Sequence, residues 1–299
     1  MKYQATTSHP DPIHVTAHFL RATTVGSFEV HVRNLRTGKS FTNISADLIQ
    51  DVRQQRSCRE LLLTTAFQGI IKITTHSVFG VLDPGNVAPS EATAGLKTSS
   101  SLRVTPFFKP PSQFRPHRNF PRWNYREYLS VHSEPSVKMR HQDLSKTKYA
   151  TGGMESGMWM QLAHPSEKLT PKSLTLFSDL FPGSLPTTVI KDVGRNWFLT
   201  VVISIEFKAP IPRDSSMYSL RTVGVFVSSR FINDPQARHD VCLELWTAPC
   251  DFDSEKDLKA DWRQQQQCLA VAHQTALVLP MSVNKRRGQK VPNTSSAKL

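Results

Sequence analysis

Hydrophobic and polar residues alternate along the first eighty residues in a way that predicts β-structure. Within residues 28–35, for example, Phe28, Val30 and Val32 are separated by polar residues, and a Thr37-Gly38-Lys39 turn follows. Strict alternation over four to eight residues is typical of a half-buried strand. We therefore predict four antiparallel strands, at 14–21, 28–35, 41–50 and 70–81, joined by short turns as a meander.

Residues 51–69 interrupt this meander. A polar run at 53–56 is followed by an apolar run at 61–65, with no hairpin turn between them. Two explanations remain open, a short helix inserted in a loop or a translation artefact of the gene model.

Residues 83–150 have the composition of a linker. Pro, Ser, Gly and Thr dominate 83–113, and Pro110-Pro111 is the clearest break in the pattern. Three aromatic residues near its middle, Trp123, Tyr125 and Tyr128, predict that part of the linker packs on the folded body.

The second half of the chain predicts a strand, a helix and four more strands. Thr170 suits a helix N-cap and Pro171 the first turn, and apolar residues then recur at helical spacing until Pro182-Gly183. Those apolar residues are Leu174, Phe177, Leu180 and Phe181. The predicted strands are 154–163 before the helix and 198–207, 218–229, 239–246 and 268–279 after it.

The two halves contain similar segments in the same order. Residues 15–20 align with 203–208 at an offset of 188, which places Phe19 on Phe207, and residues 45–49 match 242–246 slightly further on. Two similar sets of strands, one preceded by a helix, predict an internal duplication.

Charge and composition narrow the classes of partner. The 299 residues carry a net charge of +13, and 101–150 hold ten Lys and Arg against three acids, with a second basic cluster at 285–290. These segments are either solvated surfaces or sites for an anionic partner such as the phosphates of coenzyme A. No nucleic-acid motif frames them, so nucleic acid is not an expected partner.

The sequence gives little support for a membrane protein, a secreted protein, a metalloprotein or an enzyme with a cysteine or serine nucleophile. The longest mostly apolar stretch, 198–205, is far shorter than the ~20 residues of a membrane helix, and residues 1–10 have no signal-peptide core. The four cysteines form no C-x-x-C motif, so no metal or cofactor is predicted. None of them has a base nearby in sequence, and the serine of residues 153–157 sits one position late for a G-x-S-x-G nucleophile.

Several short motifs, in this order, resemble the acyl-CoA thioesterase II proteins of the thioesterase-like superfamily, and the fungal-type branch in particular. In the first half these are residues 18–21, residues 36–41 and Gln50; in the second they are Phe177-Ser178-Asp179, Leu199-Thr200 and residues 269–279. The resemblance implies an α+β double hotdog, two tandem antiparallel sheets that each wrap a helix. The first repeat lacks its helix here, so we expect an N-terminally incomplete family member, through a late start of the gene model or decay of this repeat.

The resemblance also divides the chain. It implies an N-terminal hotdog repeat at 1–82, a basic linker at 83–150, a C-terminal repeat at 151–284 and a flexible basic tail at 285–299.

By resemblance, Asp179, Thr200 and Gln274 form the catalytic site. Asp179 is expected to be the general base, Thr200 and Gln274 are expected to hold the attacking water, and backbone N–H groups or a helix N-terminus to stabilise the oxyanion. Alternation predicts that all three point away from the apolar faces of their own elements, with Thr200 opposite Ile203. Gln274 would lie among small residues, Ala270, Ala272 and Ala276.

The expected activity is hydrolysis of an acyl-CoA to a free acid and CoA, in fatty-acid metabolism, without a cofactor. The alternatives are a pathway-specific thioesterase for a polyketide-type acyl chain, and a catalytically inactive hotdog that binds acyl-CoA. A homo-oligomer is expected. The ending Ala297-Lys298-Leu299 is a variant of the peroxisomal address, which predicts peroxisomal location and an import receptor as partner, and a cytoplasmic location otherwise.

Overall fold

The structure is a computed structural model, and it describes residues 8–51, 69–82, 103–114, 127–137, 154–180, 195–213, 216–233 and 235–283. The N-terminal strands are β1 (Asp11–Phe19), β2 (Glu29–Thr37), β3 (Thr42–Gln50) and β4 (Ile70–Gly80). After them come the 3-10 turn η1 (Pro111–Gln113), β5 (Leu129–Ser133), β6 (Met154–Leu162), the helix α3 (Pro171–Phe177) and β7 (Asn196–Phe207). The last strands are β8 (Thr222–Ser229), β9 (Ile232–Asn233), β10 (Arg238–Thr247) and β11 (Cys268–Pro280).

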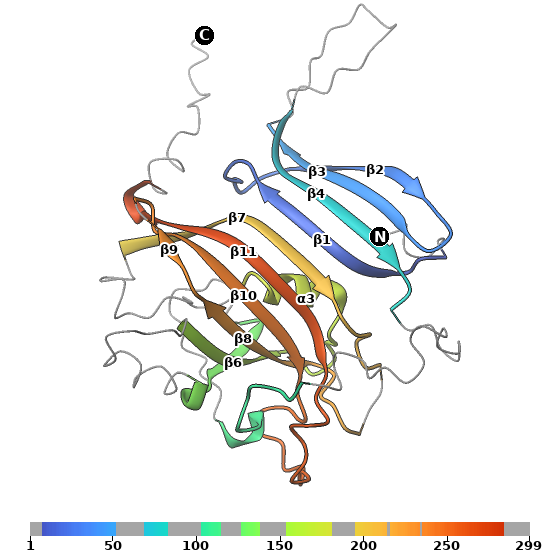
Figure 1. The fold of residues 1–299 in the computed structure, drawn as a ribbon, viewed down its shortest axis with the longest axis vertical. Helices are drawn as coiled ribbons and strands as arrows, with labels where there is room; N and C mark the ends of the chain where they lie inside the picture. Colours follow the sequence, from blue (N-terminus) through green and yellow to red (C-terminus); the bar gives the residue numbers. More distant parts are fainter. Residues whose placement is uncertain are drawn as a thin grey trace, which may run out of the picture.

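All of these strands belong to one antiparallel sheet (Figure 1). Its order is β2-β3-β4-β1-β7-β11-β10-β8-β6-β5, with β9 paired to β10. Pairing of β1 with β7 joins the N-terminal half, β1–β4, to the C-terminal half, β5–β11. The four predicted N-terminal strands are present, but β1 pairs with β4 rather than β2, so only β2, β3 and β4 form a meander.

The two halves share one strand order. Taken from the junction outward, the N-terminal half runs β1-β4-β3-β2 and the C-terminal half runs β7-β11-β10-β8. In each half the first of these four strands in sequence lies at the junction and the second lies farthest from it. At the centre of the junction Thr16 of β1 faces Ser204 of β7, and these two residues are 188 positions apart, the offset found in the sequence.

The two halves also share two β-bulges. Ile13 is the extra residue where β1 pairs with β4, and Val201 is the extra residue where β7 pairs with β11, again 188 positions apart. In the second bulge the extra residue is Lys72, where β4 pairs with β3, and Leu269, where β11 pairs with β10. These two residues are 197 positions apart, the same offset that relates 45–49 to 242–246. A bulge is a specific local feature of a strand pair. Because both bulges occur at matching positions in the two halves, they show which residues of one half correspond to which residues of the other.

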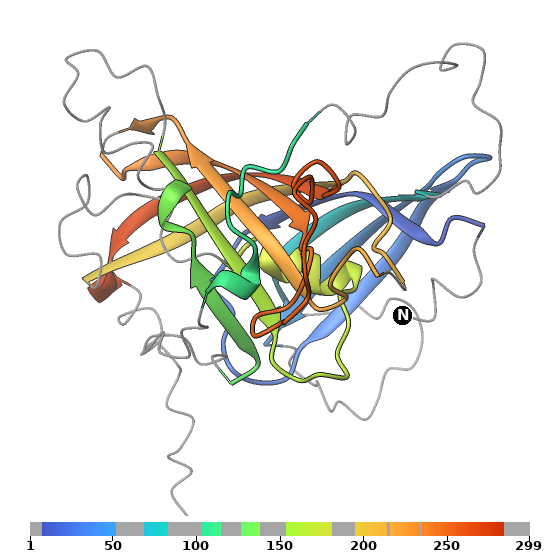
Figure 2. The ribbon, with the colours of Figure 1, turned by 90° about the horizontal axis from the view of Figure 1, so that it is seen from below.

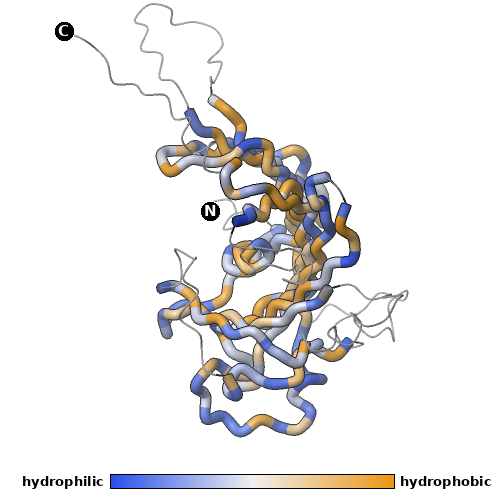
Figure 3. Tube along the Cα trace, turned by 90° about the vertical axis from the view of Figure 1, so that its left-hand side faces the viewer, coloured by the Kyte–Doolittle hydropathy of each residue, from blue (hydrophilic) through white to orange (hydrophobic). Residues whose placement is uncertain are grey.

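The helix α3 packs on the concave face of the C-terminal half (Figures 2 and 3), which we call the inner face. Thr170 caps it, accepting a hydrogen bond from the Ser173 backbone in a capping box, and Pro171 occupies the first turn, as predicted. Leu174 and Phe177 are fully buried against inward residues of the strands. The helix ends at Phe177, earlier than its apolar spacing predicts, and Phe181 with the stop at 182–183 lies outside the described residues.

Part of the predicted linker covers the opposite, outer face of this half. Phe107 is fully buried, with its ring 4.3 Å from that of Trp159, and it packs over Gly224, where any Cβ would lie 2.6 Å from the Phe107 ring. The linker also contributes β5, which pairs with β6. Tyr128, expected to pack, is 64% exposed, while Trp123 and Tyr125 lie outside the described residues.

The inner face of the N-terminal half differs from its counterpart. Among the described residues no helix covers it, and Val30 and Val32 of β2 are about half exposed, at 51% and 54%. Val15, Ala17 and Phe19 of β1 contact the core beneath α3, and Ile44 of β3 is buried, at 6% exposed. In the described part of the chain no helix is long and apolar enough to cross a membrane.

Candidate functional site

The structure brings Asp179, Thr200 and Gln274 together on the inner face. Thr200 Oγ1 donates a hydrogen bond to Asp179 Oδ1 at 2.8 Å and lies 3.3 Å from Gln274 Oε1. Gln274 Nε2 lies 3.3 Å from the same Asp179 oxygen. Asp179 follows α3, Thr200 lies in β7 and Gln274 in β11, so three elements meet at one hydrogen-bonded cluster.

Gln274 is the fixed member of the cluster. It is 4% exposed, and its Nε2 donates to the Ser178 backbone carbonyl at 2.7 Å. Ser178 in turn caps the end of α3, with both its N–H and its hydroxyl bonded to the Leu174 carbonyl. The glutamine side chain therefore ties the end of the helix to the sheet, and so sets the position of Asp179.

Gln274 shares a face with the alanines of β11, as predicted, whereas the face of Thr200 differs from the prediction. Gln274 faces Ile203 across the β7–β11 pair, and both are buried on the inner face, so the alanine side of β11 is the side against α3. Thr200 was predicted to point away from Ile203. The extra residue Val201 shifts the alternation by one, so that Thr200 faces Ala276 and joins Gln274 on the inner face.

The carboxyl group of Asp179 is poised to accept a proton. Desolvation raises its pKa above the usual aspartate value, although the residue as a whole is exposed, and hydrogen bonds from Thr200 and Gln274 partly oppose the rise. Both hydrogen bonds go to Oδ1. Oδ2 accepts none from the described residues, which leaves one oxygen free to bind a water molecule.

The amino end of α3 does not lie at the site, where a helix N-terminus was expected as one possible support for the oxyanion. Asp179 lies beyond the carboxyl end of the helix, where the helix dipole is negative, so the amino end of α3 is at the far side from the site. The expectation that a helix N-terminus supports the oxyanion therefore fails for this helix.

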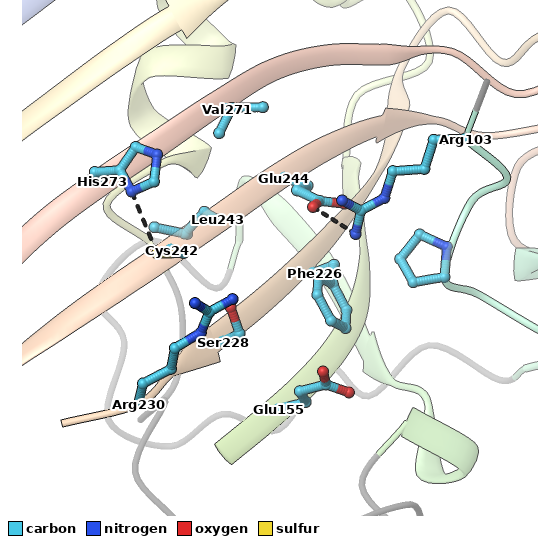
Figure 4. A pocket seen from close by; sticks show the side chains of 11 residues that line it. Arg103, Glu155, Phe226, Ser228, Arg230, Cys242, Leu243, Glu244, Val271 and His273 are labelled. Carbon is cyan, nitrogen blue, oxygen red and sulfur yellow. Dashed lines mark hydrogen bonds and ion pairs between the residues drawn. The ribbon is translucent and has the colours of Figure 1, made fainter. Parts of the chain in front are cut away.

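A pocket lies on the outer face of the C-terminal half (Figure 4). It has a volume of about 340 Å³ and contains Cys242 of β10 and His273 of β11, whose Sγ and Nδ1 atoms are 3.2 Å apart. Sequence spacing gave no base near any cysteine, because these two meet only across strands. Burial raises the pKa of the Cys242 thiol, which disfavours the thiolate that a nucleophile requires.

A metal ion in a protein is held by several side chains that lie close together. Across the described ranges, no group of three or more His, Cys, Asp or Glu side chains is placed to hold an ion.

Comparison with known proteins gives one family match. Residues 2–69 match the family described as acyl-CoA thioesterase N-terminal domain, and the match runs through the interrupting segment 51–69, most of which lies outside the described residues. No curated protein matches the chain.

Several solved structures share this fold, and one of them is described as a hotdog-fold protein. A hotdog-fold protein of unknown function from Alicyclobacillus acidocaldarius is 16% identical over 93% of this chain and 83% of its own, with a TM-score of 0.61. The acyl-CoA thioesterase II TesB2 of Mycobacterium marinum is 14% identical over 90% and 80%, with a TM-score of 0.54. The tesB protein of Mycobacterium avium subspecies paratuberculosis is 12% identical over 93% and 82%, with a TM-score of 0.51.

These findings confirm the resemblance to the thioesterase-like superfamily, and the fold is a hotdog fold.

Proposed function

We propose that this protein hydrolyses acyl-CoA thioesters with a water molecule activated by Asp179. The observation that carries the proposal is the cluster of Asp179, Thr200 and Gln274, in which a partly desolvated carboxyl group keeps one oxygen free. The family match over residues 2–69 supports the acyl-CoA class of substrate.

In the proposed reaction Asp179 Oδ2 accepts a proton from water as the water oxygen bonds to the thioester carbonyl carbon. Thr200 and Gln274 were expected to hold the attacking water; in this proposal they bond to Asp179 Oδ1 instead, which fixes the direction in which Oδ2 points. The carbon–sulfur bond then breaks, the proton passes from Asp179 to the departing sulfur, and the products are a free acid and CoA. No covalent acyl-enzyme is formed.

We also propose that the chain is a double hotdog whose repeats are residues 1–82 and 151–284. The common strand order and the two bulges at matching offsets support the duplication. The N-terminal repeat is incomplete in this proposal, in agreement with its inner face, which no described helix covers.

Thiol release from a series of acyl-CoAs of increasing chain length tests the proposal, with the purified full chain and circular dichroism to establish folding. Hydrolysis is the expected result, and its chain-length profile defines the substrate. Hydrolysis of polyketide-type thioesters alone would favour the pathway-specific alternative. A folded chain that binds acyl-CoA without turnover would refute hydrolysis and favour the binding module.

Location and assembly are part of the same proposal. We propose that Ala297-Lys298-Leu299, outside the described residues, addresses the protein to peroxisomes, where acyl-CoA would be available. A full chain that stays peroxisomal after removal of these three residues would refute this. The proposed homo-oligomer is tested by the mass of the purified chain in light scattering.

A further inference from the structure

Another pocket lies where the two halves of the sheet meet. It has a volume of about 320 Å³, between the start of β1 and the segment that follows β7. Its floor is apolar, with Phe207 and Leu169 buried and Leu82 packed against the same core as α3. This size and this lining are typical of a site for part of a small molecule.

Two cations stand at the rim of this pocket. Lys168 and Arg213 both line it, both are exposed, and neither is ion-paired within the described part of the chain. Among the described lining residues Asp11 alone is acidic, and its Oδ2 accepts the backbone N–H of Leu82 at 2.9 Å. The pocket therefore presents two available positive charges above an apolar floor.

Two other pockets among the described residues each have fewer cations without an ion pair or a side-chain hydrogen bond. In the outer-face pocket Arg103 is held by Glu244 at 2.7 Å, which leaves Arg230 as the one described lining cation without an ion pair. In the polar cleft on the far side of Lys168, Arg221 is held by Asp251 at 2.7 Å, and Lys256 Nζ donates to the Pro249 carbonyl at 2.9 Å. Cations already engaged by protein oxygens have less capacity to bind a phosphate group.

The position of the pocket relates it to the catalytic cluster. The helix α3 begins at the pocket, with Thr170 and Pro171 in its lining, and Asp179 follows its other end. Seven helical residues span about 10 Å. Along β1, from Pro12 in the pocket to His18, which pairs with Val202 near Thr200, the separation is about 20 Å. The pocket and the cluster are thus one to two nanometres apart along the same face.

The geometry points to a subsite for the phosphate end of coenzyme A, with Lys168 and Arg213 as the residues that bind it. This inference rests on the proposed function, because it concerns the substrate of that reaction. The pantetheine arm has a backbone about as long as four extended residues, ~14 Å. The arm is therefore long enough for the ~10 Å path along α3 from phosphates at the rim to a thioester near Asp179, and shorter than the ~20 Å path along β1.

The test compares one acyl group on two carriers, CoA and pantetheine, which lacks the nucleotide and its phosphates. The double variant Lys168→Ala, Arg213→Ala is expected to raise KM for acyl-CoA about tenfold or more, because each charge-assisted hydrogen bond to phosphate is lost. Neither its kcat nor its KM for acyl-pantetheine should change. Raising the ionic strength should increase KM for acyl-CoA in the unaltered protein more than in the variant.

The matched control is Arg36→Ala, Lys39→Ala, which removes two exposed cations from the β2–β3 hairpin, neither of which lines the pocket. An equal rise of KM for both carriers, or a rise in the control alone, would overturn the assignment.

Calorimetric binding of free CoA separates this inference from the proposed function. If neither thioester is hydrolysed, the proposed function fails. Loss of CoA binding in the double variant alone would then still support the subsite, and equal binding by both proteins would refute it.

Discussion

Replacement of Asp179 by asparagine is expected to abolish turnover without loss of the fold. Asparagine has the same shape, and its Oδ1 can still accept hydrogen bonds from Thr200 Oγ1 and Gln274 Nε2. What it lacks is the capacity to take a proton. A positioned general base contributes about 10²–10⁴-fold to a rate, so kcat should fall by a factor in this range, equivalent to about 3–5 kcal/mol of transition-state stabilisation.

The same substitution is expected to leave the free energy of unfolding at pH 7 equal or larger. Desolvation raises the pKa of Asp179 in the folded state, so ionisation is less favourable there than in the unfolded chain. The stability linked to this carboxyl group is fully present below its unfolded pKa and decreases as pH rises through the folded pKa. Asparagine removes that loss, and any advantage of the variant should vanish in acid. The site thus trades stability for function.

Three measurements examine this reasoning: thiol release at saturating acyl-CoA, acyl-CoA affinity, and urea unfolding at pH 7 and pH 4. The matched control is Asp257→Asn, which changes an exposed aspartate in the segment between β10 and β11 and should change none of the three quantities. Turnover within threefold of the unaltered protein would refute Asp179 as the base. A marked loss of stability at pH 7 would refute the account of its desolvation.

Three further substitutions have defined outcomes. Thr200→Val removes a donor that lowers the pKa of Asp179, so kcat should fall about tenfold and the acidic limb of kcat/KM against pH should move to higher pH. Gln274→Leu leaves the Ser178 carbonyl without its donor and should lower the free energy of unfolding in urea by about 1–3 kcal/mol, with slower thiol release. Gly224→Ala places a Cβ 2.6 Å from the Phe107 ring and should cost about 1–3 kcal/mol in the same urea assay.

Each of these has a control. Thr200→Ser keeps the hydroxyl, and an equal shift of its acidic limb would contradict the role of the hydrogen bond. Gln274→Glu keeps the size of the side chain and an oxygen but loses the amide donor, so full activity there would exclude that donor from the site. Gly38→Ala meets only the Phe41 carbonyl oxygen, at 3.4 Å, and should leave stability nearly unchanged; a loss as large as that of Gly224→Ala would remove the argument from close packing.

The sequence predicted the local elements of this fold well because each has a local cause. The sequence predicted every strand except β5, which lies in the predicted linker, and the short β9. Thr170 with Pro171 predicted where α3 begins. The offset between the halves also appears in the structure, at the Thr16–Ser204 contact. These features depend on residues close in sequence or on similarity between segments, both of which a single sequence contains.

The features that the sequence did not predict depend on pairing between distant strands. The bulge at Val201 is visible only when β7 and β11 are in register, and it places Thr200 on the face opposite to the one that alternation predicts. Cys242 and His273 are neighbours only across β10 and β11. The burial of Phe107 was also not predicted, because the residues around it have the composition of a loop.

The way the two halves are joined has a consequence for how the chain folds as it is synthesised. β1–β4 emerge from the ribosome first, yet β1 must pair with β7, whose residues lie 188 positions downstream at the centre of the contact. Until then the edge of β1 and an inner face without a described helix remain open, and such edges promote association with other chains. The N-terminal half therefore completes its packing only after the C-terminal half has supplied both an edge and a core, so the interval in which it is open to association with other chains lasts until β7 has been synthesised.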